Sequence, residues 1–272
     1  MAQQDRNIIA VLGLTGSGKS TFINRCIGSD VAVAGSQLNS ITKSPQIYNM
    51  EHRGLPVQLI DTPGFDDTDV SDVDRLQELA LYLTSMYKHK TNLTGIIYLH
   101  DVRSERVGGV ALKNIQILQD LTGIENFNAI TVATNFWTDP PAGRSLKHES
   151  ALKSEPKFFG TMLQASAGYW RLQMTETGGQ TDCLGLIDQV LRHKLPVTAL
   201  TIQRELVDQE LAFVDTRAGQ RVYRELLNST RESLERIKQL EARLNETLRQ
   251  LEARVPNFVV EIYRRWVHWS WG

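Results

Sequence analysis

The sequence predicts an α/β fold, with a mostly parallel sheet between two layers of helices, followed by a long α-helical extension. Short apolar, β-branched runs alternate with segments of helical periodicity over the first 198 residues. A glycine-rich turn follows the first of these runs. Beyond residue 198, Glu, Arg and Gln dominate and no strand-like run is found up to residue 255. We therefore expect two domains, residues 1–198 and residues 199–272.

The expected strands are short apolar runs bounded by glycine, proline or polar residues. They span residues 7–13, 56–61, 94–100, 127–134 and 169–173. Apolar residues at helical spacing predict helices over residues 19–28, 70–87, 107–121, 150–163 and 184–192. Because a helix separates each strand from the next, the strands are expected to run parallel.

The extension has an imperfect heptad pattern. One heptad position holds Leu227, Leu234, Leu248 and Val255, and the other holds Ile237, Leu244 and Leu251. Thr230 and Glu241 interrupt the seam. Two interpretations stay open: an amphipathic helix that packs on the first domain or in a helical hairpin, or an intermolecular coiled coil that makes a homodimer.

Composition is ordinary for a soluble globular chain, with 41% hydrophobic and 22% charged residues. The formal net charge of −1 gives no general attraction to nucleic acid, so we expect no nucleic-acid partner. Cys26 and Cys183 are far apart and lack metal-ligand spacing, which favours a reducing compartment. The polar start, MAQQDRN, does not resemble a secretory signal, and we expect a cytoplasmic location.

A phosphate-binding motif follows the first expected strand. Residues 13–20, GLTGSGKS, match G-x-x-x-x-G-K-[ST] between a strand and a helix. Such a loop wraps phosphates with its backbone N–H groups, aided by the N-terminus of the following helix. The motif makes the fold a P-loop NTPase, with these expected nucleotide-binding residues: Gly13, Thr15, Gly16, Ser17, Gly18, Lys19, Ser20 and Thr21.

A second motif, Asp-Thr-Pro-Gly over residues 61–64, ends the next core strand. Asp61 is expected to hold Mg²⁺ through water, beside the Ser20 hydroxyl, and the Gly64 amide to sense the γ-phosphate. The polar loop between the motifs offers Thr42 as a further Mg²⁺ ligand, with Ser40 as its competitor. The expected catalytic set is Lys19, Thr42 and Gly64, with Lys19 bridging the β- and γ-phosphates, and the expected metal ligands are Ser20, Thr42 and Asp61.

These motifs, with SITKSP, DTPGFDD and GIIYLHDVRSERVGG, resemble the septin-like branch of P-loop GTPases. The resemblance is strongest to fungal G-domain proteins related to the immunity-associated GTPases, and covers residues 7–220, most specifically 93–123. It implies binding of GTP and GDP with Mg²⁺, slow hydrolysis, and nucleotide-dependent dimerisation across the nucleotide face.

The sequence departs from this family where the base should be read. After the fourth strand, such proteins usually carry Asn or Thr, then Lys, any residue, and Asp. Here the segment is Thr134-Asn-Phe-Trp137, with Asp139 two residues late. Asn135 is expected to give a hydrogen bond and Trp137 a stacking face, or Trp137 packs beneath the loop. The pair Ser166-Ala167 precedes the last expected strand, whereas the family places the base-contacting loop after it.

Intrinsic hydrolysis is expected to be weak, because Phe65 stands after Gly64 and cannot orient a water molecule. His100, Arg103 and Arg106 are candidates for supply across a dimer face, although His100 at a strand end also fits a packing role.

The C-terminal end is rich in aromatic residues, among them three of the five tryptophans. One helical face would carry Phe258, Ile262, Trp266 and Trp269, with Arg264, Arg265 and His268 off it. This face could lie at a membrane surface or pack within the protein.

The leading hypothesis is a GTP-dependent switch or assembly GTPase. One alternative is an ATP-using or base-promiscuous P-loop enzyme, which the missing Lys-Asp pair keeps open. Another is a nucleotide-binding scaffold that acts through its helical tail.

Overall fold

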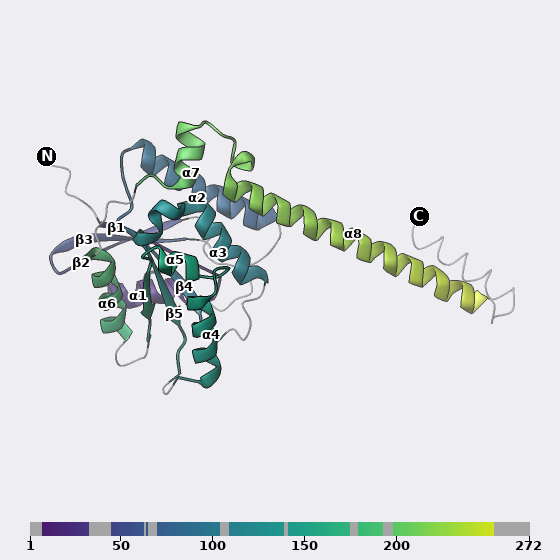
Figure 1. The fold of residues 1–272 in the computed structure, drawn as a ribbon, viewed down its shortest axis with the longest axis horizontal. Helices are drawn as coiled ribbons and strands as arrows, with labels where there is room; N and C mark the ends of the chain where they lie inside the picture. The colour runs from purple at the N-terminus through teal and green to yellow at the C-terminus, as the bar shows by residue number, and fades with distance from the viewer. Residues whose placement is uncertain are drawn as a thin grey trace. The chain divides into compact units, whose positions relative to one another are not determined.

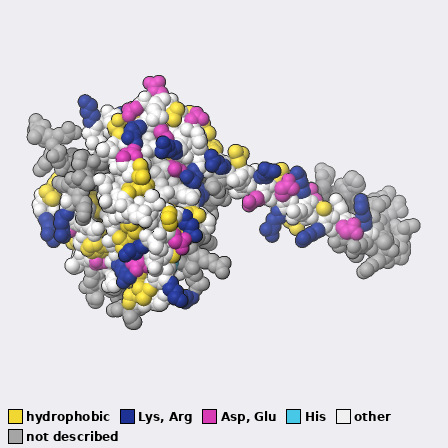
Figure 2. Space-filling model, in the orientation of Figure 1, with side chains coloured by type: hydrophobic (Ala, Val, Ile, Leu, Met, Phe, Trp, Pro, Cys, Tyr) yellow, Lys and Arg dark blue, Asp and Glu magenta, His cyan; other side chains and the backbone are white. Residues whose placement is uncertain are grey.

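The computed structural model describes residues 7–32, 45–62, 64, 70–103, 109–138, 141–174, 179–192 and 198–252. The chain divides into two compact units, Met1–Tyr223 and Arg224–Gly272. The first unit is an α/β domain built on one six-stranded sheet (Figure 1). Basic and acidic side chains are interspersed over the face seen in Figure 2.

The sheet has the strand order β2-β3-β1-β4-β5-β6. The strands are β1 (Asn7–Gly13), β2 (Gln46–His52), β3 (Leu55–Asp61), β4 (Gly95–Asp101), β5 (Ile130–Asn135) and β6 (Gly168–Arg171). All neighbours pair in parallel except β2, which is antiparallel to β3. The expected mostly parallel sheet is confirmed. The sequence did not predict β2, because this edge strand is largely exposed and has no apolar run.

Helices cover both faces of the sheet. They are α1 (Lys19–Ile27), α2 (Val70–Lys88), α3 (Gly109–Thr122), α4 (Gly143–Ser154), α5 (Gly160–Gln164) and α6 (Gly179–Arg192). Helices α1 and α6 cover one face, where Ile97 and Leu99 of β4 join a buried cluster with Phe22 and Leu186. The other four helices cover the opposite face (Figure 1). There Tyr98 of β4 meets Phe159, just before α5, edge to face.

One expected helix was wrong in its bounds. A single helix was expected over residues 150–163, but α4 ends at Ser154 and α5 begins at Gly160. The reason is Pro156, which disfavours helical backbone at the residue before it. Glu155 accordingly has extended backbone, with φ −82° and ψ 126°. Before β5, residues Ile124–Ala129 form a 3₁₀ helix, η1, so that strand begins later than expected.

The first unit continues past the expected boundary at residue 198. After a short α7 (Thr201–Gln203), the π-helix η2 (Arg204–Asp208) and the 3₁₀ helix η3 (Phe213–Asp215), α8 runs over Arg217–Glu252. The Gln203 side chain donates to the Leu83 carbonyl of α2 at 2.8 Å. Arg221 of α8 pairs with Asp120 of α3 and donates to Gln116 at 2.9 Å. These contacts tie residues 200–222 to the α/β domain.

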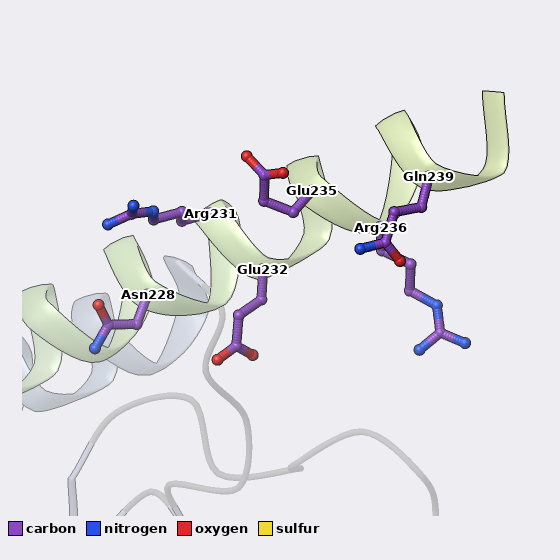
Figure 3. Close-up of a pocket in the computed structure, with 6 residues that line it drawn as sticks. All are labelled: Asn228, Arg231, Glu232, Glu235, Arg236 and Gln239. Carbon is purple, nitrogen blue, oxygen red and sulfur yellow. The ribbon is translucent and has the colours of Figure 1, made fainter. Parts of the chain in front are cut away.

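The second unit contains the rest of α8, a strongly amphipathic helix. Asn228, Arg231, Glu232, Glu235, Arg236 and Gln239 line a shallow polar hollow on one side of it (Figure 3). By helical spacing, the opposite side carries Leu227, Leu234, Ile237 and Leu240, all exposed. What this stripe packs against stays a prediction. No helix among the described residues is long and apolar enough to cross a membrane, and residues 253–272, with the C-terminal aromatics, lie outside them.

Candidate functional site

The loop between β1 and α1 has the backbone that its glycines predict. Gly13, Gly16 and Gly18 have positive φ angles of 142°, 74° and 95°, a region that side-chain-bearing residues rarely adopt. A Cβ on Gly13 would also overlap the Leu99 carbonyl of β4. A Cβ on Gly18 would stand 2.6 Å from the Asn135 amide nitrogen. The loop is therefore a cradle that only glycine can form at these places.

Lys19 lies within this loop. Its side chain is buried, and the ammonium donates to the carbonyls of Gly13 at 3.0 Å and Leu14 at 2.8 Å. These bonds hold a positive charge at the centre of the cradle, where a phosphate anion would be attracted. Ser17 is buried and Thr21 is exposed on the first turn of α1.

Ser20 and Asp61 are 41 residues apart in sequence but form a hydrogen-bonded pair. The Ser20 hydroxyl donates to Asp61 Oδ2 at 2.9 Å. The other carboxylate oxygen, Oδ1, is buried and has no hydrogen-bond partner among the described residues. Burial raises the pKa of Asp61, while the Ser20 hydrogen bond and the Lys19 charge oppose that rise. A hydroxyl beside a carboxylate with an unused oxygen fits a hard divalent cation such as Mg²⁺.

Gly64 packs directly on the phosphate loop. A Cβ at Gly64 would overlap the backbone nitrogen and hydroxyl of Thr15. Just before it, the Thr62 hydroxyl donates to the Val11 carbonyl at 2.9 Å and fixes the segment to β1. The two sequence motifs therefore meet at the carboxyl ends of β1 and β3, as predicted. Thr42, its competitor Ser40, and Phe65 lie outside the described residues.

Asn135 ends β5 and ties it to the phosphate loop. Its side-chain nitrogen, Nδ2, donates to the Ser17 carbonyl at 3.3 Å, and its side-chain oxygen, Oδ1, accepts from the Phe136 N–H at 2.7 Å. Both polar atoms of the side chain therefore have protein partners in this structure. The expected hydrogen bond to the base stays a prediction.

Trp137 is half-buried and held by a polar network. Its indole N–H donates to the Thr134 carbonyl and hydroxyl, each at 3.1 Å. The Arg171 guanidinium lies 4.6 Å from the ring centroid, and Arg171 pairs with Glu149. Glu149 also accepts from the Tyr169 hydroxyl at 2.9 Å. These contacts join Trp137 to α4 and β6, in agreement with the packing interpretation.

Phe136 and Arg103 were not identified together from the sequence. Phe136 has a φ of 63°, and the Arg103 guanidinium lies 3.8 Å from its ring centroid. The ring tip, Cζ, is 3.7 Å from the position of a Cβ on Gly18. The only signal in the sequence was an aromatic residue within the segment that usually carries the base-reading lysine and aspartate. Met174, after β6, also reaches Gly18, with its methyl 2.9 Å from that Cβ position.

His100 lies inside the domain. It is 3% exposed, and its ring meets those of Phe159 and His148 edge-on, at centroid distances of 5.8 and 5.4 Å. Burial lowers its pKa to about 4, and His148 adds to this effect, while Asp101 opposes it. His100 is thus neutral at pH 7 and packed in the core. Of its two companions, Arg103 lies at the end of β4 and Arg106 is outside the described residues.

Comparisons with known proteins agree with this geometry. A family model described as a 50S ribosome-binding GTPase matches residues 8–135. The probable GTP-binding protein EngB of Streptococcus equi subsp. equi is 30% identical over 159 residues, which cover 57% of this chain and 73% of that protein. Immune-associated nucleotide-binding protein 3 of Arabidopsis thaliana is 42% identical over 67 residues, 24% of this chain and 20% of that protein.

Solved structures share the fold. Toc33 from Arabidopsis thaliana in complex with Mg²⁺ and GMPPNP superimposes with a TM-score of 0.55 at 16% identity, over 70% of this chain and 85% of that one. A second structure gives a TM-score of 0.54 at 15% identity, over 72% of this chain and 87% of that one. It comes from work on the chloroplast translocon components atToc33 and psToc159, which is described as showing that dimerization is important for their GTPase activity.

Proposed function

This chain belongs to the family of GTP-binding G-domain GTPases, and we propose that it is a GTP-dependent switch or assembly GTPase with slow, Mg²⁺-dependent hydrolysis of GTP to GDP. The observation that carries this proposal is the meeting of the two motifs, with Ser20 bonded to Asp61 and Gly64 packed on Thr15. A segment that touches the phosphate loop at the γ-phosphate end can respond to loss of that phosphate.

Each motif residue has a role in this proposal. Lys19, held at the centre of the glycine cradle, pairs with the β- and γ-phosphates while the loop amides bind the remaining oxygens. Ser20 and Asp61, together with Thr42, hold Mg²⁺. When bound, Mg²⁺ neutralises negative charge on the phosphates. The Gly64 amide contacts the γ-phosphate.

Slow turnover is proposed because Phe65 follows Gly64, and a phenyl ring cannot position the attacking water. Assembly of two chains across the nucleotide face would supply the missing polar group. The report on atToc33 and psToc159 that dimerization is important for GTPase activity supports this part of the proposal. Arg103 follows β4 by two residues, at the same end of the strands as the phosphate loop.

A calorimetric titration with GTP, GDP, ATP and ADP in Mg²⁺ tests the proposal. We expect GTP and GDP to bind, and phosphate release under multiple turnover to be slow. The Lys19→Ala variant is expected to lose most triphosphate affinity, since its removal leaves the phosphates without their ammonium partner. Absence of any binding by the unsubstituted chain would contradict the nucleotide role, and absence of phosphate release would favour the scaffold alternative.

A base-promiscuous or ATP-using NTPase is the second candidate. The lysine and aspartate that usually read guanine are missing from residues 134–137, and Trp137 itself contacts Thr134 and Arg171. Equal affinities for ATP and GTP in the same titration would favour this candidate.

A further inference from the structure

We propose that the base of the bound nucleotide is held by its face against Phe136, whose ring is backed by the Arg103 guanidinium, and that none of the described side-chain carboxylates reads its edge. This rests on the proposed function, because it describes the base subsite of the same nucleotide site. It makes Phe136 a base-binding residue and Arg103 a positioning residue.

Phe136 stands where a base would leave the phosphate loop. It directly follows Asn135, whose side chain bonds to the loop at Ser17, and the ring tip lies against Gly18. Its φ of 63° is strained for an aromatic residue. Such conformations persist where the surroundings enforce them, and they gather at functional sites. Here the bond from the Phe136 N–H to Asn135 Oδ1 helps to hold the residue in place.

Arg103 is fixed over the Phe136 ring. Strands β4 and β5 are paired up to Asp101 and Asn135, and the Val102 N–H donates to the Asn135 carbonyl at 3.1 Å. Asp101 grips the guanidinium in a fork, with Nη2–Oδ2 at 2.7 Å and Nε–Oδ1 at 3.1 Å. The guanidinium then lies 3.8 Å from the ring centroid, within the range of a cation–π contact. This contact orients the ring and occupies one of its faces, so a base would stack on the other.

Trp137 contacts β5 and β6 (Thr134 and Arg171). Its indole N–H is engaged by Thr134, and one ring face is covered by Arg171, which Glu149 anchors. The Phe136 ring, by contrast, is among the three nearest contacts of the Cβ position of Gly18.

Three described carboxylates near this end of the sheet have other partners. Asp101 holds Arg103, Glu149 holds Arg171 and Tyr169, and Asp182 accepts from the Trp170 indole at 3.2 Å. The usual guanine-reading aspartate is missing from residues 134–137, and Asp139, two residues late, lies outside the described residues. Stacking on a ring face tolerates different bases, whereas an edge-reading carboxylate selects the guanine N1–H and 2-amino group. The 2-amino group should therefore contribute little to affinity.

The test is a titration of the full chain in Mg²⁺ with GTP, with ITP, which lacks the 2-amino group, and with inorganic triphosphate, which lacks the base. We expect GTP and ITP to bind the unsubstituted chain within a few-fold of each other. Phe136→Ala should weaken both on the order of ten-fold, the size of one base–aromatic stack. It should leave the affinity for inorganic triphosphate unchanged, and Phe136→Tyr should restore the affinity for both nucleotides.

A double-substitution cycle tests the role of Arg103. Arg103→Ala should weaken GTP binding a few-fold in the unsubstituted chain and have no effect when combined with Phe136→Ala, because Arg103 acts through the ring. An equal effect in both backgrounds would overturn that role.

The outcomes separate this inference from the proposed function. A chain that binds neither GTP nor inorganic triphosphate refutes the proposed function. An unchanged affinity for GTP in Phe136→Ala refutes the stacking platform alone. So does an affinity of the unsubstituted chain for ITP that is a hundred-fold weaker than its affinity for GTP. If Phe136→Ala lost as much affinity for inorganic triphosphate as for GTP, the effect would be structural, and the platform would also be refuted.

Discussion

At the scale of single residues, the site depends on glycines, because a Cβ at several of these positions would overlap neighbouring atoms. The contact between Gly64 and Thr15 is so close that a single methyl group would separate the two motifs. The loop glycines act in the same way: Gly13 admits the Leu99 carbonyl, and Gly18 admits Asn135 and Met174. These close approaches explain why the motif positions are fixed in residue type and not only in polarity.

Gly64→Ala should weaken binding of a non-hydrolysable GTP analogue more than binding of GDP, with the analogue losing on the order of ten-fold, about 1.4 kcal/mol. The physical reason is that the added Cβ displaces the segment that contacts the γ-phosphate, which GDP lacks. Isothermal titration in Mg²⁺ measures both affinities. Gly143→Ala is the matched control, because a Cβ there meets nothing within 4 Å. Equal losses for both nucleotides would argue against a γ-phosphate contact at Gly64.

The buried imidazole of His100 gives a prediction about acid stability. Its pKa is about 4 in the folded chain, mainly through burial, against an ordinary value of 6.5. The unfolded chain therefore binds a proton more readily, and folding stability should fall as the pH drops from about 6.5 to about 4. The slope for this group is at most about 1.4 kcal/mol per pH unit.

Urea unfolding at pH 7, 6 and 5 measures this slope. His100→Gln should flatten it, whereas His89→Gln, at an exposed position on the same domain, should not. An unchanged slope in His100→Gln would show that other groups carry the acid sensitivity.

At the scale of elements, a polar cluster fastens the β2–β3 hairpin to α6. Asp188 of α6 is buried and pairs with His52 at 2.7 Å and with Arg53 at 2.7 Å. Tyr48 and Met50 of the edge strand β2 are only partly buried against the core, and this cluster and the ladder with β3 help to hold the strand in place.

Asp188→Ala should lower the free energy of unfolding by about 2 kcal/mol, because it leaves a buried imidazole without its partner. Chemical denaturation measures the loss. Glu78→Ala, at an exposed position of α2, is the control and should change stability by less than about 0.5 kcal/mol. If Asp188→Ala were as mild as this control, the cluster would contribute nothing to the stability of the hairpin.

At the scale of the whole molecule, nucleotide and metal should stabilise the fold together. With Mg²⁺ and GTP at a hundred times the dissociation constant, binding to the folded state adds about 2.7 kcal/mol. That corresponds to a rise in melting temperature on the order of 5–10 °C for a domain of this size. Differential scanning fluorimetry measures the shift. Removal of Mg²⁺ with EDTA should reduce it, and Lys19→Ala should abolish it. A shift that survived Lys19→Ala would place the nucleotide outside the phosphate loop.

Several features of the molecule could be predicted from the sequence because they are written in local patterns. Apolar runs predicted the strands of the sheet interior, and the spacing of glycine, lysine and serine predicted the cradle. The Asp61 motif predicted its meeting with Ser20, since both follow strands whose carboxyl ends share one edge. The edge strand β2 and the break at Pro156 escaped prediction, because one has no apolar run and the other interrupts a helical pattern.

The sequence by itself thus determined the α/β class, the phosphate loop and the pairing of its two motifs. Only the tertiary structure decided which aromatic residue faces the loop, that Asn135 bonds to Ser17, and that residues 200–222 belong to the first unit. It also placed Arg103 on Phe136 and His52 on Asp188. The physical reason is that periodicity and motif spacing record the environment of neighbouring residues along the chain. Ring stacking, ion pairing and close backbone approach depend on how distant strands and helices are brought together.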